Sequence, residues 1–215
     1  MTVTAKICGV NSMAAVRAVV AGGASHVGFV FYPPSPRFVT PEQAADLMAD
    51  LPDSIIPVGL FVDAEDDWID TVCTAAPLRM LQLHGKETPE RAAVLKARHN
   101  RLIMKAVSVA GASDVDRADD YTDAADWLLF DAKPPSTMTD ALPGGNAVQF
   151  DWSLMAGRTW PIPWMLAGGI DAENVARAAR EANARVVDVS SSVEDAPGVK
   201  SPEKITEFLA AVAAL

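Results

Sequence analysis

Residues 164–190, WMLAGGIDAENVARAAREANARVVDVS, contain one complete strand–helix–strand unit. Trp164–Ala167 and Arg185–Ser190 are short apolar runs that end at small or polar residues, which is typical of buried strands. The segment between them, 171–182, is rich in alanine and carries charged residues at helical spacing. Two parallel strands need such a crossover, so the stretch predicts an α/β fold built from βα units.

The same alternation extends outward over the whole chain and predicts a (βα)8 barrel. We expect eight strands, at Val3–Cys8, His26–Phe31, Ile55–Val62, Arg79–Leu83, Leu102–Val107, Trp127–Asp131, Trp164–Ala167 and Arg185–Ser190. We expect eight helices, at about 11–22, 41–51, 65–76, 88–99, 113–121, 151–157, 171–182 and 201–214. Three of these helices begin with a hydroxyl residue before a proline, a capping pattern, at Thr40, Thr88 and Ser201. Since 215 residues lie near the lower end for this fold, we expect one domain, residues 1–215.

Composition limits the environment and the partners of the chain. No uninterrupted apolar run is long enough to span a membrane, and the first residues lack a secretory pattern. The two cysteines, Cys8 and Cys73, are too few for a disulfide framework, which favours the reducing cytoplasm. A net charge of −10 is unfavourable for binding nucleic acid or an anionic membrane. We therefore expect a cytoplasmic protein whose partner is a small molecule.

Polar residues gather where the predicted strands end, which is where a barrel of this kind has its active site. The last two strands run into AGGID and DVSSSVE, which offer small residues and backbone N–H groups suited to a phosphate. The other polar residues at strand ends or in the loops that follow are Cys8, Arg37, Asp63, Gln82, His84, Lys105 and Asp131. The pattern predicts a phosphate-binding active site. For Asp63 we expect only a capping role at the third helix.

The chain resembles the phosphoribosylanthranilate isomerase family over nearly its whole length. The matching motifs are KICGV at 6–10, GFVFYPPSPRFV at 28–39, GLFVDA at 59–64, LQLHG at 81–85, LLFDAK at 128–133, LPGG at 142–145 with FDW at 150–152, LAGGIDAENV at 166–175 and VDVSSSVEDAPGVK at 187–200. The resemblance implies an isomerase of tryptophan biosynthesis that acts on phosphoribosylanthranilate by an Amadori rearrangement.

The resemblance also implies roles for individual residues. Cys8 corresponds to the family's general base and Asp131 to its general acid. Arg37 corresponds to the arginine that binds the anthranilate carboxylate. The phosphate-binding residues would be Gly144, Gly145, Gly168, Gly169, Ser190, Ser191 and Ser192. Within this set we expect the phosphate among Gly145, Gly169 and Ser191.

Two positions depart from the family pattern. Ala147 and Ser192 stand where the family commonly has glycine, and a required positive φ at either position would weaken the approach to the phosphate.

The implied chemistry needs one acid and one base. Asp131 must hold its proton near neutral pH, which burial or negative neighbours favour, whereas Cys8 must become a thiolate. Lys6 shares a strand face with Cys8, and Asp188 shares one with Ser190. Because buried charges are seldom left unpaired, we expect a Lys6–Asp188 ion pair beneath the site, with Lys6 favouring the thiolate.

The remaining polar residues are expected to support the site without binding a metal. We expect Gln82 and His84 to support the site through packing or hydrogen bonds. His26 and His99 lie too far from His84 in the predicted fold to form a metal cluster with it, and Cys73 falls within a helix. Both proton transfers are within reach of side chains, so we expect no metal and no cofactor.

Three alternatives remain at this point. The related isomerase of histidine biosynthesis runs the same rearrangement but has an aspartate as its first-strand base, so Cys8 disfavours it. A ribulose phosphate epimerase would need a metal held by histidines and carboxylates. A catalytically silent barrel that binds a phosphorylated metabolite or a protein would be expected to lack at least one of Cys8, Arg37 and Asp131.

Overall fold

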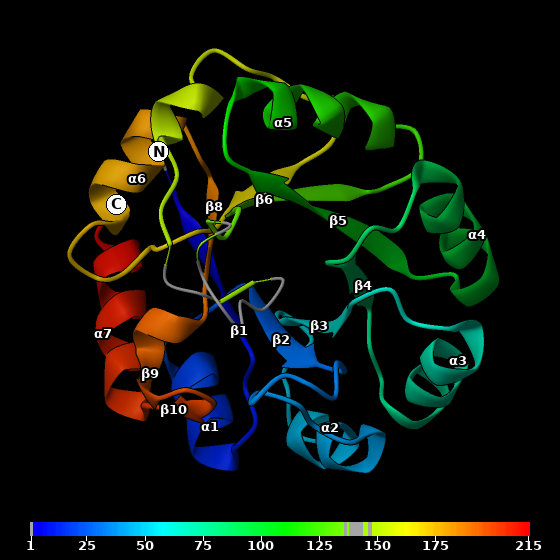
Figure 1. The fold of residues 1–215 in the computed structure, drawn as a ribbon. Coiled ribbons are helices and arrows are strands. Elements are labelled where there is room, and N and C mark those ends of the chain that lie inside the picture. Colours follow the sequence, from blue (N-terminus) through cyan, green and yellow to red (C-terminus); the bar gives the residue numbers. More distant parts are fainter. Residues whose placement is uncertain (1, 136, 138–143, 146–147) are drawn as a thin grey trace.

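The protein is a closed barrel of parallel strands surrounded by helices (Figure 1). The computed structural model describes residues 2–135, 137, 144–145 and 148–215. The barrel strands are β1 (Thr4–Cys8), β2 (His26–Val30), β3 (Ile56–Phe61), β4 (Met80–Leu83), β5 (Leu102–Val109), β6 (Trp127–Ala132), β7 (Trp164–Leu166) and β8 (Val186–Val189). Each strand pairs with the next, and β8 closes on β1. The predicted (βα)8 barrel is confirmed.

Helices follow most strands and lie on the outside of the ring (Figure 1). They are α1 (Met13–Ala21), α2 (Pro41–Met48), α3 (Asp66–Ala75), α4 (Pro89–His99), α5 (Ala112–Asp116), α6 (Val175–Ala182) and α7 (Pro202–Ala213). After α5 the chain continues as a 3-10 helix, Arg117–Tyr121. Within the described residues, seven of the eight predicted helices are therefore present, with ends shifted by up to four residues when the 3-10 helix is counted with α5.

Two local predictions are wrong. The helix expected at 151–157 is a short 3-10 helix, Trp152–Met155, because Ala156 already has an extended backbone and Gly157 after it takes a positive φ of 75°. The hydroxyl of Ser201 does not cap α7 but donates to Glu203, whereas Thr40 and Thr88 cap α2 and α4 as predicted.

A hairpin that the sequence pattern did not predict lies between β8 and α7. Its strands are β9 (Glu194–Ala196) and β10 (Val199–Lys200), which pair antiparallel with Lys200 opposite Glu194. In Figure 1 this hairpin lies beside α1 and α7, at the rim of the barrel. It contributes to the site described below.

Hydrophobic packing separates the barrel into layers that position the site. One large core lies between the strands and the helices. A second, inside the barrel, includes Met80, Met104 and Met165. Above it, Cys8 packs with Val30 and Leu60. Cys8 thus lies where the packed interior of the barrel meets its open end. Within the described residues, no helix is long and apolar enough to cross a membrane.

Candidate active site

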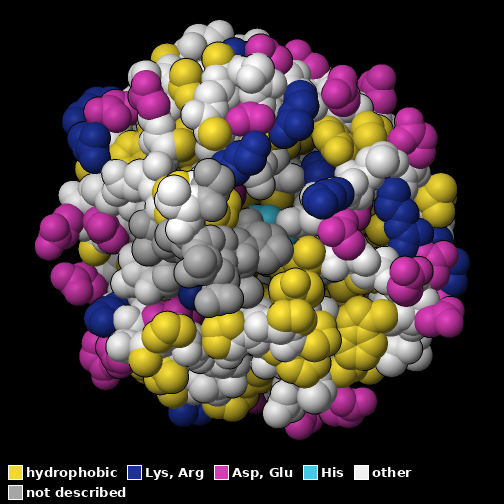
Figure 2. All heavy atoms as spheres, in the orientation of Figure 1, with side chains coloured by type: hydrophobic (Ala, Val, Ile, Leu, Met, Phe, Trp, Pro, Cys, Tyr) yellow, Lys and Arg dark blue, Asp and Glu magenta, His cyan; other side chains and the backbone are white. Residues whose placement is uncertain are grey.

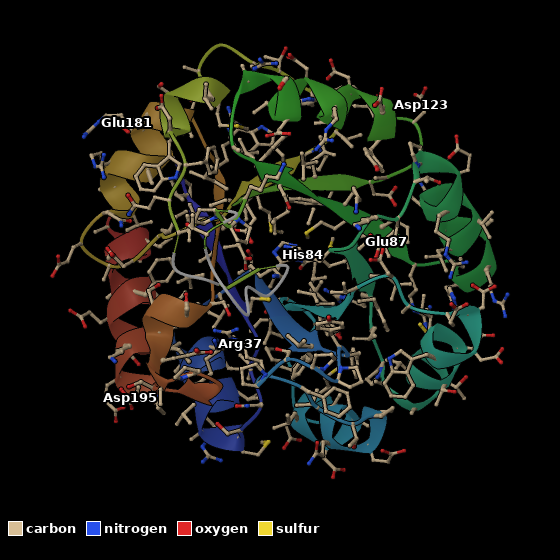
Figure 3. All side chains as sticks on the ribbon, viewed as in Figure 1. Arg37, His84, Glu87, Asp123, Glu181 and Asp195 are labelled. Carbon is tan, nitrogen blue, oxygen red and sulfur yellow. The ribbon has the colours of Figure 1, made fainter. Side chains whose placement is uncertain are left out.

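A pocket opens at the carboxyl ends of the strands and brings the predicted residues together. Its lining includes Cys8, Arg37, His84, Asp131, Gly144, Gly145, Gly168, Gly169, Asp188, Ser190, Ser191 and Ser192. Figure 3 shows His84 near the centre of the ring and Arg37 toward the β9–β10 hairpin, while Asp123, Glu181 and Asp195 lie at the outside. In Figure 2 a histidine is visible at the centre of this face, and most charged side chains lie around its rim.

Lys6 and Asp188 form the predicted ion pair beneath the pocket. They are opposite each other in the β1–β8 register, and the Lys6 ammonium lies 2.9 Å from Asp188 Oδ1. The Lys6 side chain is fully buried. Burial acts to lower the pKa of Lys6, but the charge and hydrogen bond of Asp188 raise it above its ordinary value overall. Lys6 is therefore a permanent cation below the pocket.

The Cys8 thiol lies directly above this pair. A Cβ atom placed on Gly28 would be 3.0 Å from Cys8 Sγ and 3.3 Å from Lys6 Cε, so both side chains lie against the same glycine. Burial raises the pKa of Cys8, and the charge of Asp188 raises it too, while Lys6 and Lys200 lower it. Lys6 thus favours the thiolate as expected, but burial outweighs it, and the ligand-free protein holds a thiol.

Asp131 is the last residue but one of β6 and lies beside His84. Its Oδ1 accepts the backbone N–H of Ala132 at 2.9 Å, and its Oδ2 lies 3.4 Å from His84 Nε2. Gln82 Nε2 lies 2.9 Å from His84 Nδ1, so Gln82 and His84 form a buried pair behind Asp131. Gly144 covers this arrangement closely, since an added Cβ would lie 2.8 Å from Asp131 Oδ2.

Arg37 is held by residues that the sequence analysis did not select. Its Nε donates to Glu194 Oε1 at 2.7 Å and its Nη2 to Glu194 Oε2 at 2.9 Å. Lys200 donates to Glu194 Oε1 at 2.6 Å and to the Ser190 carbonyl at 2.8 Å. One feature of the sequence could have indicated these residues. In 194–200, a Glu and a Lys lie on either side of a Pro-Gly turn, and a hairpin at this turn would bring the two side chains together.

The glycines after β6 and β7 adopt the backbone expected of a close ligand approach. Gly145, Gly168 and Gly169 have φ values of 74°, 88° and 63°. An added Cβ on Gly168 would be 2.9 Å from Ala132 N, and one on Gly169 would be 2.3 Å from Gln149 Cγ. Only glycine fits these positions without strain. Together with Ser190–Ser192 they form one side of the pocket.

The two departures from the family pattern have different outcomes. Ser192 is not among the described non-glycine residues with positive φ, and its hydroxyl donates to the Ile170 carbonyl. A serine therefore fits there without backbone strain and joins the loop after β8 to that after β7. Ala147 lies outside the described residues.

Asp63 does not cap the third helix. The residue before α3 is Glu65, which makes no capping bond with its side chain. Asp63 instead accepts the N–H of Lys86 at 2.6 Å, and its own N–H donates to Glu87. Lys105 donates to Glu87 at 2.8 Å and to the Gly85 carbonyl at 2.7 Å. Asp63 and Lys105 thus hold together the loops after β3 and β4, and neither side chain lines the pocket.

The remaining candidate side chains lie apart from the pocket. His26 is at the opposite end of the barrel, in register with Lys6, and His99 ends α4. Cys73 is within α3. Over residues 2–135, 137, 144–145 and 148–215, no group of three or more His, Cys, Asp or Glu side chains is arranged to hold a metal ion.

The fold and the pocket define an enzyme of the (βα)8 barrel class, with its site at the carboxyl ends of the strands. A family model described as N-(5'phosphoribosyl)anthranilate (PRA) isomerase matches residues 5–211. The protein named N-(5'-phosphoribosyl)anthranilate isomerase from Rhodospirillum centenum is 54% identical over 215 residues, 100% of both chains. The one from Paracoccus denitrificans is 52% identical over 98% of this chain and 97% of its own length.

Solved structures of phosphoribosyl anthranilate isomerases are also similar to this chain. The phosphoribosyl anthranilate isomerase of Thermotoga maritima is 35% identical over 100% of both chains, with a TM-score of 0.85. A phosphoribosyl anthranilate isomerase in complex with reduced 1-(o-carboxyphenylamino)-1-deoxyribulose 5-phosphate is 34% identical over 100% of both chains, with a TM-score of 0.82. This chain belongs to the N-(5'-phosphoribosyl)anthranilate isomerase family and is an isomerase.

Proposed function

We propose that this chain converts N-(5-phosphoribosyl)anthranilate to 1-(2-carboxyphenylamino)-1-deoxyribulose 5-phosphate in tryptophan biosynthesis, by an Amadori rearrangement. Cys8 is the general base and Asp131 the general acid. The observation that carries the proposal is that Cys8, Arg37 and Asp131 line one pocket, beside the positive-φ glycines and the serines after β6, β7 and β8. A family relative crystallised with a reduced form of such a product supports this substrate class.

The acid step belongs to Asp131. Its Oδ1 is occupied by the Ala132 N–H, so Oδ2 is the oxygen that carries the proton to the furanose ring oxygen as the C1′–O bond breaks. The electron pair on the anthranilate nitrogen forms the C1′=N bond, and the product of this step is a protonated Schiff base. Asp131 is 8% exposed, and in this proposal its carboxyl group enters the reaction as the proton donor.

The base step belongs to Cys8. The positive Schiff base acidifies the neighbouring C2′–H, and its charge favours a thiolate beside it. The Cys8 thiol first loses its proton to solvent, and the thiolate then takes the C2′ proton. The C2′–H electron pair forms a C1′=C2′ enolamine, and tautomerisation gives the aminoketose. Exchange with solvent then removes the proton from Cys8 and returns one to Asp131. Lys6, fixed by Asp188, supplies a further cation below the sulfur. The atoms of substrate and product balance, as an isomerisation requires.

Binding uses the two ends of the substrate. We assign the phosphate to the amide groups around Gly145, Gly169 and Ser191, because these residues line the pocket and the glycines permit close approach. We assign the anthranilate carboxylate to Arg37, because its guanidinium lines the pocket and N–H donors of this kind suit a carboxylate. Arg37→Met is expected to raise the KM strongly and to change kcat less.

The activity is tested directly with the purified protein and phosphoribosylanthranilate, by the loss of substrate fluorescence with time. The proposal expects turnover without added metal or cofactor, and about a 10²-fold or greater loss of kcat in Asp131→Asn. Absence of turnover by the folded wild-type protein would overturn it. The proposal includes a cytoplasmic, single-domain enzyme, which the two cysteines and the continuous βα pattern support.

A further inference from the structure

The buried carboxylate of Glu194 has no part in the two proton transfers, yet it contacts the proposed carboxylate-binding arginine. Its side chain is 4% exposed and that of Arg37 is 7% exposed. The two form a side-on, bidentate pair, with Nε to Oε1 at 2.7 Å and Nη2 to Oε2 at 2.9 Å. Such a pair fixes the plane of the guanidinium as well as its position.

The pairing with Glu194 does not use all three nitrogens of the Arg37 guanidinium. Nη2 uses its second hydrogen on the Gly145 carbonyl, at 3.3 Å. Hydrogen bonds between the described residues use Nε and Nη2 and none of them uses Nη1, while the Arg37 side chain lines the pocket. A Cβ added to Gly145 would lie 2.8 Å from this Nη1, so the nitrogen is close to the glycine segment after β6.

Glu194 is itself fixed from the other side. The Lys200 side chain is fully buried, and it donates to Glu194 Oε1 at 2.6 Å and to the Ser190 carbonyl at 2.8 Å. Burial acts to raise the pKa of Glu194, but the hydrogen bond from Arg37 and the charge of Lys200 bring it below its ordinary value overall. Glu194 is thus an anion between two cations.

The tip of the hairpin packs against the segment that carries the arginine. Gly198 has a φ of 82°, and an added Cβ would lie 2.3 Å from the Pro36 carbonyl oxygen. The Gly198 N–H donates to Glu194 Oε2 at 3.3 Å, and its carbonyl accepts Asn11 at 2.8 Å. The β9–β10 hairpin therefore packs against Pro36 and is hydrogen-bonded to the loop after β1.

We propose that Glu194 is a positioning residue that sets substrate specificity, by holding Arg37 with Nη1 aimed at the ortho-carboxylate of an N-aryl aminosugar phosphate. Lys200 fixes Glu194 and links it to Ser190 at the phosphate end of the pocket. This inference rests on the role of Arg37 in the proposed function. It differs from a purely structural role, which would stabilise the hairpin without distinguishing ligands.

Two ligands separate these roles. The first is reduced 1-(o-carboxyphenylamino)-1-deoxyribulose 5-phosphate, and the second is the same molecule with an unsubstituted phenyl ring. The quantity measured for each variant is the Kd of the carboxyl-free ligand divided by the Kd of the carboxylated ligand, by calorimetry or competitive inhibition. Loss of a well-aligned charged hydrogen bond predicts that Glu194→Gln weakens the carboxylated ligand about 10-fold or more. The carboxyl-free ligand should change less than about 2-fold, because it does not use Arg37.

Three further variants complete the test. Glu194→Asp keeps the charge but shortens the side chain, so it should lower the ratio as well. In an Arg37→Met background, Glu194→Gln should have no further effect on the ratio. Asp195→Asn is the matched control, because Asp195 is the next residue of the same hairpin but its side chain is 59% exposed and forms an ion pair with Lys204 at the surface (Figure 3). It should leave both Kd values unchanged.

The outcomes that overturn the proposal are distinct. If Arg37→Met lowers the ratio but Glu194→Gln weakens both ligands equally, Glu194 is structural. If Glu194→Gln tightens the carboxylated ligand, the carboxylate only reduces local positive charge and does not orient Arg37. If Arg37→Met itself leaves the ratio unchanged, the carboxylate assignment in the proposed function fails, and the positioning role fails with it.

Discussion

The Lys6 ammonium and the Asp188 carboxylate face each other across the β1–β8 seam of the barrel, 2.9 Å apart, directly beneath the Cys8 thiol. The seam is where the two ends of the barrel sequence meet. The same pair of charges therefore lies where the barrel closes and places a cation beneath the active site.

Removing Asp188 alone should destabilise the fold. Asp188→Ala leaves the fully buried Lys6 without its partner, and breaking a buried pair in this way costs about 3–5 kcal/mol. Urea unfolding monitored by tryptophan fluorescence measures the change. The double variant Lys6→Met/Asp188→Leu should recover much of the loss, because it leaves no buried charge unpaired. A single-variant loss below about 1 kcal/mol would contradict this account of the seam.

His26 should make the fold acid-sensitive. Burial, with the charges of Lys6 and Arg79, lowers its pKa in the folded protein from 6.5 to about 4. Between these values the unfolded chain binds more protons, so the free energy of unfolding falls as the pH falls from about 6.5 to about 4. The full shift corresponds to roughly 3 kcal/mol. His26→Gln should lose less stability than the wild type over this interval. Equal losses in the two proteins, measured by urea unfolding across this pH range, would exclude His26 as the cause.

Gly144 should be required for activity because of its contact with Asp131 and His84. An added Cβ would lie 2.8 Å from Asp131 Oδ2 and from His84 Nε2, so Gly144→Ala must displace the acid or the loop. We expect kcat to fall about 10-fold or more, since small misplacements of reacting groups are costly. Gly111→Ala is the control, because a Cβ at Gly111 meets nothing within 4 Å. Equal kcat values in the two variants would count against a close approach at Gly144.

The sequence predicts the barrel well because its signals are local and repeated. Each strand is a short apolar run followed by turn residues, and the predicted strand ends agree with the structure within two residues, as for β5 (Leu102–Val109 against a predicted end at Val107). The Lys6–Asp188 pair was predictable because strand alternation and the closing seam place both charges inside.

The rest of the site depends on contacts that a pattern does not encode. Glu194 and Lys200 belong to a short hairpin inside a connection, and Glu194 meets Arg37 from a position 157 residues away. The sign of the net pKa shift at Cys8 required the burial of the thiol as well as the neighbouring charge. The catalytic and binding roles of individual residues remain predictions, as does the single-domain interpretation of residues 1–215.

The most direct test of the account is the kcat of Cys8→Ala for phosphoribosylanthranilate, compared with that of Cys73→Ala. Cys8 lines the pocket above Lys6, whereas Cys73 lies in α3 away from it, so the pair controls for loss of a thiol as such. The account predicts about a 10²-fold or greater fall in kcat for Cys8→Ala, with the fold retained, and near wild-type turnover for Cys73→Ala. Near wild-type turnover by a folded Cys8→Ala variant would show that another group takes the C2′ proton, and the mechanism proposed here would be wrong.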